Sequence, residues 1–217
     1  MIVHTIETRI HGRYLIEPAM DQPAPLLVGF HGYAETAEPM LTQLTAFGDG
    51  WSRVSIQALH RFYNRSQDVV ANWMTRQDRD LEIAANVEYV TSVIRNVQRD
   101  YSTDRPIVFV GFSQGVAMAY RAAVNVECQG VIALAGDVPP DVVSRARTLP
   151  PILIGRGNSD RWYTEEKAAA DLRTLADADV RVVEHVFEGG HAWGASFVIA
   201  ARDFLRSLET DARRGAP

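Results

Sequence analysis

The sequence has little of what marks disulfide-stapled or membrane-spanning proteins. Its one cysteine, Cys128, permits no internal disulfide and fits a reducing compartment. No apolar run approaches the roughly 18 residues that a membrane span needs, and residues 1–7 carry charge where a signal peptide has an apolar core. We therefore expect a cytoplasmic protein without a membrane span.

Basic residues and cofactor motifs are also scarce. Lys and Arg number 22 against 27 Asp and Glu, giving a net charge of −5, and the basic residues are scattered rather than clustered. This balance argues against nucleic acid as a partner. The sequence has no metal-ligand spacing, glycine-rich phosphate loop or dinucleotide fingerprint, so no metal or cofactor is expected.

The 217 residues contain no composition shift or flexible linker, which predicts a single domain over residues 1–217. Apolar stretches alternate with amphipathic ones, as in a mostly parallel sheet with helices on both faces. Strands are expected through residues 2–16 (a strand or hairpin) and near 26–31, 53–59, 106–111, 130–135, 151–155 and 180–187, and the clearest helices near 80–100 and 193–209. The sequence leaves a homodimer open.

The most informative motif is the run from Gly111 to Gly115, which has the pattern Gly-x-Ser-x-Gly. An apolar strand enters the motif and a helix-forming segment leaves it. A serine on such a sharp turn has its hydroxyl exposed at the end of the sheet, and glycines on both sides leave room for the neighbouring backbone. The motif predicts Ser113 as a nucleophile, against the alternative of an ordinary helix cap.

A nucleophilic serine needs a base and an orienting acid, and later strand ends supply both. Asp160 follows the apolar strand at 151–155, and His191 follows the strand at 180–187. The chain order Ser, Asp, His is one of three orders in which such triads occur. Asp137 is a rival for the acid, and His185, inside a strand, a weaker rival for the base.

The apolar strand near 26–31 leads into His31, Gly32 and Tyr33, a loop that we predict to help bind an oxyanion. One backbone N–H would come from Tyr33 and the other from Gln114, the residue after the nucleophile. Gly32 would allow the close approach of this loop, and His31 would support it structurally rather than carry protons.

These motifs together resemble the α/β-hydrolase superfamily, and within it the phospholipase/carboxylesterase group that includes acyl-protein thioesterases. The resemblance covers nearly the whole chain and includes a tryptophan, Trp73, before the long helix. It implies an α/β-hydrolase fold and a serine hydrolase acting on esters or thioesters through Ser113, Asp160 and His191. The first loop departs from the His-Gly-x-Gly-Asp run of the eukaryotic thioesterases, because Ala34 and Glu35 replace its second Gly and its Asp.

The substrate is expected to be a small-molecule ester or thioester, bound in an open site. Only a short connection separates residues 135 and 150, so no sizeable cap domain is expected. We predict that the walls include Tyr63, Arg65 and Trp73 of a loop at residues 61–79, together with Trp162 and Trp193, although the aromatic residues could equally pack the core. The loop carries Arg61, Arg65, Arg76 and Arg79, which could attract a substrate with a remote acidic or phosphate group or could simply face water, and Arg65 is predicted to contact that group. A peptidase or amidase of the same fold and a catalytically silent binding protein are the alternative functions.

Overall fold

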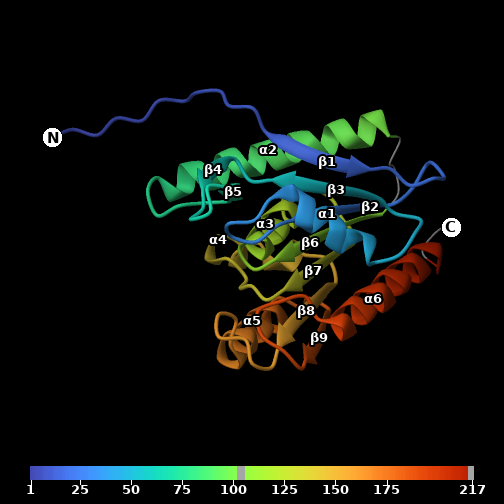
Figure 1. The fold of residues 1–217 in the computed structure, drawn as a ribbon. Helices are drawn as coiled ribbons and strands as arrows, with labels where there is room; N and C mark the ends of the chain where they lie inside the picture. Colours follow the sequence, from blue (N-terminus) through green and yellow to red (C-terminus); the bar gives the residue numbers. More distant parts are fainter. Residues whose placement is uncertain (102–105, 215–217) are drawn as a thin grey trace.

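The computed structural model describes residues 1–101 and 106–214, with side chains described as far as residue 210. A seven-stranded sheet forms the centre of the molecule (Figure 1). Only its first strand, at one edge, runs antiparallel to its neighbour, and the others run parallel. In spatial order the strands are β1 (Arg13–Glu17), β3 (Ser52–Gln57), β2 (Leu26–Phe30), β6 (Ile107–Phe112), β7 (Gly130–Leu134), β8 (Ile152–Gly157) and β9 (Val182–Phe187).

Helices cover both faces of this sheet. A Cβ atom on Gly29 would meet Met40 and Leu44, and one on Gly155 would meet Phe197. The strand register places Gly29 and Gly155 on one face, so the helices that hold these three side chains, α1 and α6, share that face (Figure 1). Helix α3 packs on the other face, with α2 against it. The helices are α1 (Ala37–Thr45), α2 (Arg79–Asp100), α3 (Gln114–Ala123), α4 (Pro140–Val143), α5 (Glu165–Asp177) and α6 (Ala195–Arg214), with a short 3₁₀ helix at Ala146–Thr148.

Burial on both faces explains why the central strands read as unbroken apolar runs. All residues of β2, β3, β6, β7 and β8 are buried. Because β2, β6, β8 and β9 are parallel, their carboxyl ends lie on the same side of the sheet. The loops that carry the predicted site residues therefore converge there.

Two parts of the expected fold were wrong. The strand or hairpin predicted through residues 2–16 is limited to β1, and residues 1–12 run away from the sheet without regular structure (Figure 1). Their apolar side chains, among them Ile2, Val3 and Ile6, are exposed, so no packing holds them in a strand. Residues 61–79 were expected as a loop but include most of an antiparallel hairpin, β4 (His60–Tyr63) and β5 (Val69–Asn72).

The connection between β7 and β8 holds only α4 and the 3₁₀ helix, so no cap domain covers the strand ends there. No helix in residues 1–101 and 106–214 combines the length and the apolar character needed to cross a membrane. The prediction of one domain over residues 1–217 stays a prediction and includes residues 102–105 and 215–217, which lie outside the described range.

Candidate active site

Ser113 sits on a strained turn between β6 and α3. Its φ of 51° and ψ of −120° place a non-glycine residue at positive φ, which costs free energy that the surrounding packing must supply. A Cβ atom on Gly111 would lie 2.5 Å from the Cα of Val116, and one on Gly115 would lie 2.0 Å from the carbonyl oxygen of Phe30. Both positions therefore exclude any larger residue, as the elbow pattern predicts.

The Ser113 hydroxyl and two side chains from other strand ends form a continuous hydrogen-bonded series. The Nε2 atom of His191 lies 2.8 Å from the Ser113 Oγ, and its Nδ1 atom lies 2.8 Å from the Asp160 Oδ2. If Nδ1 donates to the carboxylate, Nε2 is left as an acceptor facing the serine hydroxyl. This is the arrangement that a base needs to remove the serine proton.

Asp160 is held firmly in this position. Its carboxylate is 0% exposed, whereas the His191 ring is 23% exposed. The second carboxylate oxygen, Oδ1, accepts the backbone N–H groups of Trp162 at 2.7 Å and Tyr163 at 3.0 Å. The rival carboxylate, Asp137, instead forms an ion pair with Lys167 at 3.3 Å. The carboxylate that contacts the His191 imidazole is therefore that of Asp160.

Two backbone N–H groups, one in the loop after β2 and one at the start of α3, have no hydrogen-bond partner among the described residues. The N–H of Gln114 is the first of α3 and has no acceptor within the helix. Across the described residues, the N–H of Tyr33 donates no hydrogen bond either, although its neighbours Gly32 and Ala34 do. A Cβ atom on Gly32 would lie 3.2 Å from the Phe112 ring, next to Ser113. Both predicted donors are therefore available near the elbow.

His31 fixes the shape of the same loop. Its Nε2 accepts the N–H of Ala58 at 3.1 Å, so the ring proton is on Nδ1, which donates to the Gly32 carbonyl at 2.7 Å. Burial lowers the pKa of His31 to about 4, so the ring is neutral at pH 7. This neutral, buried imidazole is placed to support the loop, as the sequence suggested, and not to exchange protons.

Trp73 does not lie where a substrate could reach it. Its side chain is fully buried, packs edge-on against Phe30 and donates its indole N–H to the His31 carbonyl at 2.9 Å. The structure therefore contradicts the prediction that this side chain binds substrate and assigns it to the core. The tryptophan instead fixes the backbone of the loop that carries Tyr33.

The Gln114 side chain was missed by the sequence analysis, which considered only its backbone. Its Oε1 accepts the Trp73 N–H at 3.0 Å, and its Nε2 donates to the Met74 carbonyl at 3.4 Å. These bonds tie the segment after β5 to the elbow. The sequence of residues 73 and 74 does not predict this pairing, because Gln114 is distant along the chain and bonds only to the backbone of these two residues.

Glu35 is a second carboxylate close to the site. Its Oε2 accepts the Gly32 N–H at 2.7 Å. Burial raises the pKa of Glu35, while the Gly32 bond and the charge of His191 act in the opposite direction. Through this hydrogen bond to Gly32, Glu35 holds the loop that carries Tyr33.

A cavity of about 440 Å³ opens beside Ser113 and His191. Of the predicted wall residues, Trp162 lines this cavity and is 74% exposed. Trp193 does not line it and packs instead against Phe112 and Phe197, with its ring tilted against both. The cavity is also lined by Arg76 and Arg79, which belong to the loop that the sequence placed at the border of the site, and by Lys167, which the sequence did not assign to the site.

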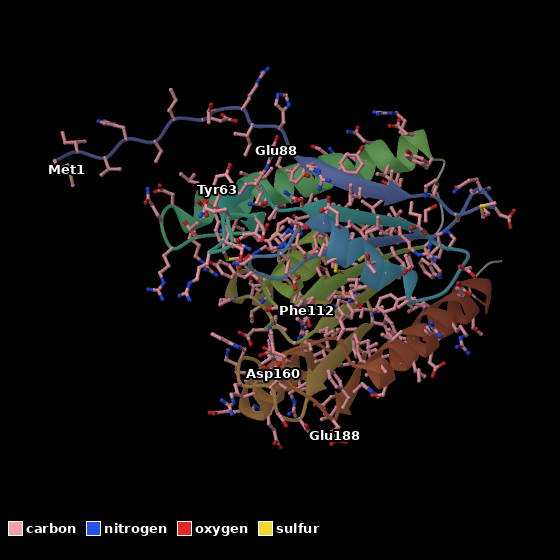
Figure 2. All side chains as sticks on the ribbon, in the orientation of Figure 1. Met1, Tyr63, Glu88, Phe112, Asp160 and Glu188 are labelled. Atoms are coloured by element: carbon pink, nitrogen blue, oxygen red, sulfur yellow. The ribbon has the colours of Figure 1, made fainter. Side chains whose placement is uncertain are left out.

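Tyr63 and Arg65 lie outside this cavity. Tyr63 ends β4, is 69% exposed and stands apart from Asp160 and Phe112 (Figure 2). Arg65 lies in the turn between β4 and β5 and does not line the cavity. The structure therefore gives neither residue the predicted position on the cavity wall, since both lie in the β4–β5 hairpin and neither lines the cavity.

Within residues 1–101 and 106–214, no group of three or more His, Cys, Asp or Glu side chains is arranged to hold a metal ion. The polar groups around Ser113 instead bond to one another in the manner of a nucleophile, a base and an acid.

Solved structures with the same fold include several esterases. Esterase PE8 is 22% identical, with coverage of 92% of this chain and 100% of that one and a TM-score of 0.73. The Bacillus cereus carboxylesterase is 16% identical (91% and 94% coverage, TM-score 0.74), and the Zea mays acyl-protein thioesterase 2 is 17% identical (91% and 99%, TM-score 0.71). At these identities the likeness establishes the α/β-hydrolase fold alone.

A comparison with curated protein sequences gives no match. The profile of the phospholipase/carboxylesterase family matches residues 67–209, a segment that contains Ser113, Asp160 and His191. This match extends over more than half of the 217 residues. The chain belongs to the phospholipase/carboxylesterase family of α/β-hydrolases.

Proposed function

We propose that this protein is a serine hydrolase that cleaves carboxylic ester or thioester bonds through a Ser113-His191-Asp160 triad and an acyl-enzyme intermediate. Membership of the phospholipase/carboxylesterase family makes it an esterase-type hydrolase. The observation that carries the finer proposal is the pair of 2.8 Å contacts that join Ser113, His191 and Asp160.

In the first half of the reaction, the Ser113 oxygen attacks the carbonyl carbon of the substrate while its proton passes to the Nε2 of His191. The carbonyl oxygen becomes an oxyanion, which the N–H groups of Tyr33 and Gln114 would stabilise. Asp160 holds the ring orientation and stabilises the imidazolium. The imidazolium then protonates the departing alcohol or thiol as the bond to the carbonyl carbon breaks.

In the second half, water attacks the acyl group on Ser113. His191 removes a proton from the water, and the same N–H groups stabilise the second oxyanion. When this intermediate collapses, the Ser113 oxygen leaves with the proton from His191, and the carboxylic acid is released. The exposed His191 edge and the absence of a cap domain give water access to the acyl group.

The test is a substrate panel run with the wild-type protein and the Ser113→Ala variant. It contains 4-nitrophenyl esters of increasing acyl length, acyl thioesters and aminoacyl anilides. We expect Ser113-dependent turnover of the esters or thioesters and little turnover of the anilides, which need stronger protonation of the leaving group. Turnover confined to anilides would indicate an amidase, and the absence of turnover across the panel would indicate a silent binding protein.

A further inference from the structure

We propose that the cavity beside Ser113 selects esters or thioesters that carry an anionic group, carboxylate or phosphate, and that Arg76 and Arg79 bind that group. This inference rests on the proposed function, because it concerns the substrate of the same site. It assigns a role to two residues that lie neither in the triad nor in the oxyanion loop.

The charged side chains that line the cavity are mostly positive. The lining contains three basic residues, Arg76, Arg79 and Lys167, and one carboxylate, Asp137. It therefore carries a net positive charge even before His191 is counted. The whole chain, in contrast, has a net charge of −5. A local positive field in an acidic protein favours an anionic ligand at that place and speeds its encounter with the site.

Lys167 is already neutralised, whereas the two arginines are not. Lys167 Nζ lies 3.3 Å from the Asp137 Oδ2. Across the described residues, neither Arg76 nor Arg79 has a carboxylate oxygen within the 4.0 Å of an ion pair. Two guanidinium groups are therefore available to a ligand, each with a planar set of donors suited to carboxylate and phosphate oxygens.

Asp141, a carboxylate that shares a surface hollow with Arg79, is bound by another arginine. Asp141 accepts the Nε–H and one Nη–H of the buried Arg121 at 2.8 and 2.7 Å. The Arg121 guanidinium is the main cause that lowers the pKa of Asp141, and the charge of Arg79 adds a smaller contribution. Asp141 lines the neighbouring surface hollow with Arg79 but not the cavity that contains Ser113.

The position of the arginines specifies which substrates are favoured. Ser113 and His191 line the same cavity as Arg76 and Arg79, so the anionic group that the arginines bind would be a part of the substrate other than the scissile bond, joined to it by a chain. Met74, Val138, Pro139 and the exposed Trp162 supply apolar surface for that chain. The volume of about 440 Å³ lies within the range of small-molecule sites.

The experiment compares esters that differ in one charge. All three substrates are 4-nitrophenyl esters. 4-Nitrophenyl hydrogen adipate is anionic, 4-nitrophenyl methyl adipate is neutral and of similar length, and 4-nitrophenyl 6-phosphonooxyhexanoate provides the phosphate. For the wild-type protein at low salt, we expect KM for the anionic esters to be roughly tenfold lower than for the neutral one, because each exposed arginine contributes a factor of roughly 2 to 5. Whichever anionic ester has the lower KM identifies the preferred anion.

Three variants test the assignment. Arg76→Gln combined with Arg79→Gln should raise KM for the anionic esters far more than for the neutral ester. Asp137→Asn should lower KM for the anionic esters, because it frees Lys167. Arg173→Gln removes an exposed charge from α5 outside the cavity and should leave the ratio of the two KM values unchanged. Raising the ionic strength from 0.01 to 0.5 M should bring the ratio towards one, since screening shortens the range of these charges.

Equal KM values for the charged and neutral esters in the wild-type protein would overturn the inference, as would a loss of preference in Arg173→Gln equal to that of the double variant. These results leave the proposed function standing, because the neutral ester reports it separately. Should no ester be hydrolysed, calorimetric titration of the Ser113→Ala variant with the anionic ester still tests the arginines. If Ser113→Ala combined with Arg76→Gln and Arg79→Gln binds the anionic ester as tightly as Ser113→Ala alone, the role of the arginines is refuted.

Discussion

Replacing Asp160 by asparagine changes a single atom of the hydrogen-bonded series and should nearly abolish turnover. The Oδ1 of Asp160 accepts two backbone N–H groups, those of Trp162 and Tyr163, and asparagine can keep both bonds with its own oxygen. Its NH₂ group then faces the Nδ1 of His191, where the Oδ2 lies 2.8 Å away in the native protein. Because NH₂ is a donor, the ring proton must move to Nε2, and no acceptor remains for the Ser113 proton.

The expected loss in kcat for a neutral 4-nitrophenyl ester is about 10⁴-fold, the size measured for this change in a serine protease, and it corresponds to about 5 kcal/mol of activation free energy. The matched control is Asp137→Asn, which removes a half-exposed carboxylate that pairs with Lys167. Exposed pairs contribute roughly 0.2–1 kcal/mol, so kcat should fall less than tenfold.

Stopped-flow measurement of the nitrophenolate burst separates acylation from deacylation in both variants, and circular dichroism checks that each is folded. We expect Asp160→Asn to lose the burst and Asp137→Asn to keep it. A larger loss in Asp137→Asn than in Asp160→Asn would refute the assignment of the acid and would transfer that role to the loop after β7.

Three further predictions concern groups that hold the site in place. Gln114→Ala removes two side-chain hydrogen bonds to backbone and should lower the free energy of unfolding by roughly 1–3 kcal/mol in urea titration; an unchanged midpoint would contradict this. Glu35→Ala leaves the Gly32 N–H without its side-chain acceptor and should lower the free energy of unfolding by roughly 1 kcal/mol; an unchanged free energy of unfolding would contradict this. Burial raises the pKa of Asp171 to about 6, so the folded state binds more protons than the unfolded state between about pH 4 and 6, and stability from this group rises as the pH falls. Burial lowers the pKa of His31 to about 4, so the stability that this group contributes falls as the pH falls from about 6.5 to 4. Asp171→Asn should therefore make unfolding more acid-sensitive, by up to roughly 3 kcal/mol at pH 4, and an unaltered pH dependence would contradict this.

The sequence was sufficient for those features that depend on local pattern. The apolar runs of β2, β6, β7 and β8 mark strands because both faces of the sheet are covered. The elbow could be recognised because its two glycines, Gly111 and Gly115, are required on steric grounds and lie within five consecutive residues.

Features that depend on long-range packing could not be predicted in this way. Trp73 looks like a wall residue in the sequence, and only the positions of Phe30 and His31 show that it is core. Among the arginines of residues 61–79, the sequence favoured Arg65 for its aromatic neighbours, but Arg65 lies in the turn of the β4–β5 hairpin and Arg76 lines the cavity instead.

The central claim is that Ser113 is the nucleophile, and covalent labelling tests it most directly. The protein is treated with a fluorophosphonate and the modified peptide is identified by mass spectrometry, with Ser113→Ala as the control. The account predicts one adduct on Ser113, formed in step with the loss of ester turnover and absent from the folded alanine variant. An adduct on another serine, or labelling and turnover that persist in Ser113→Ala, would contradict it.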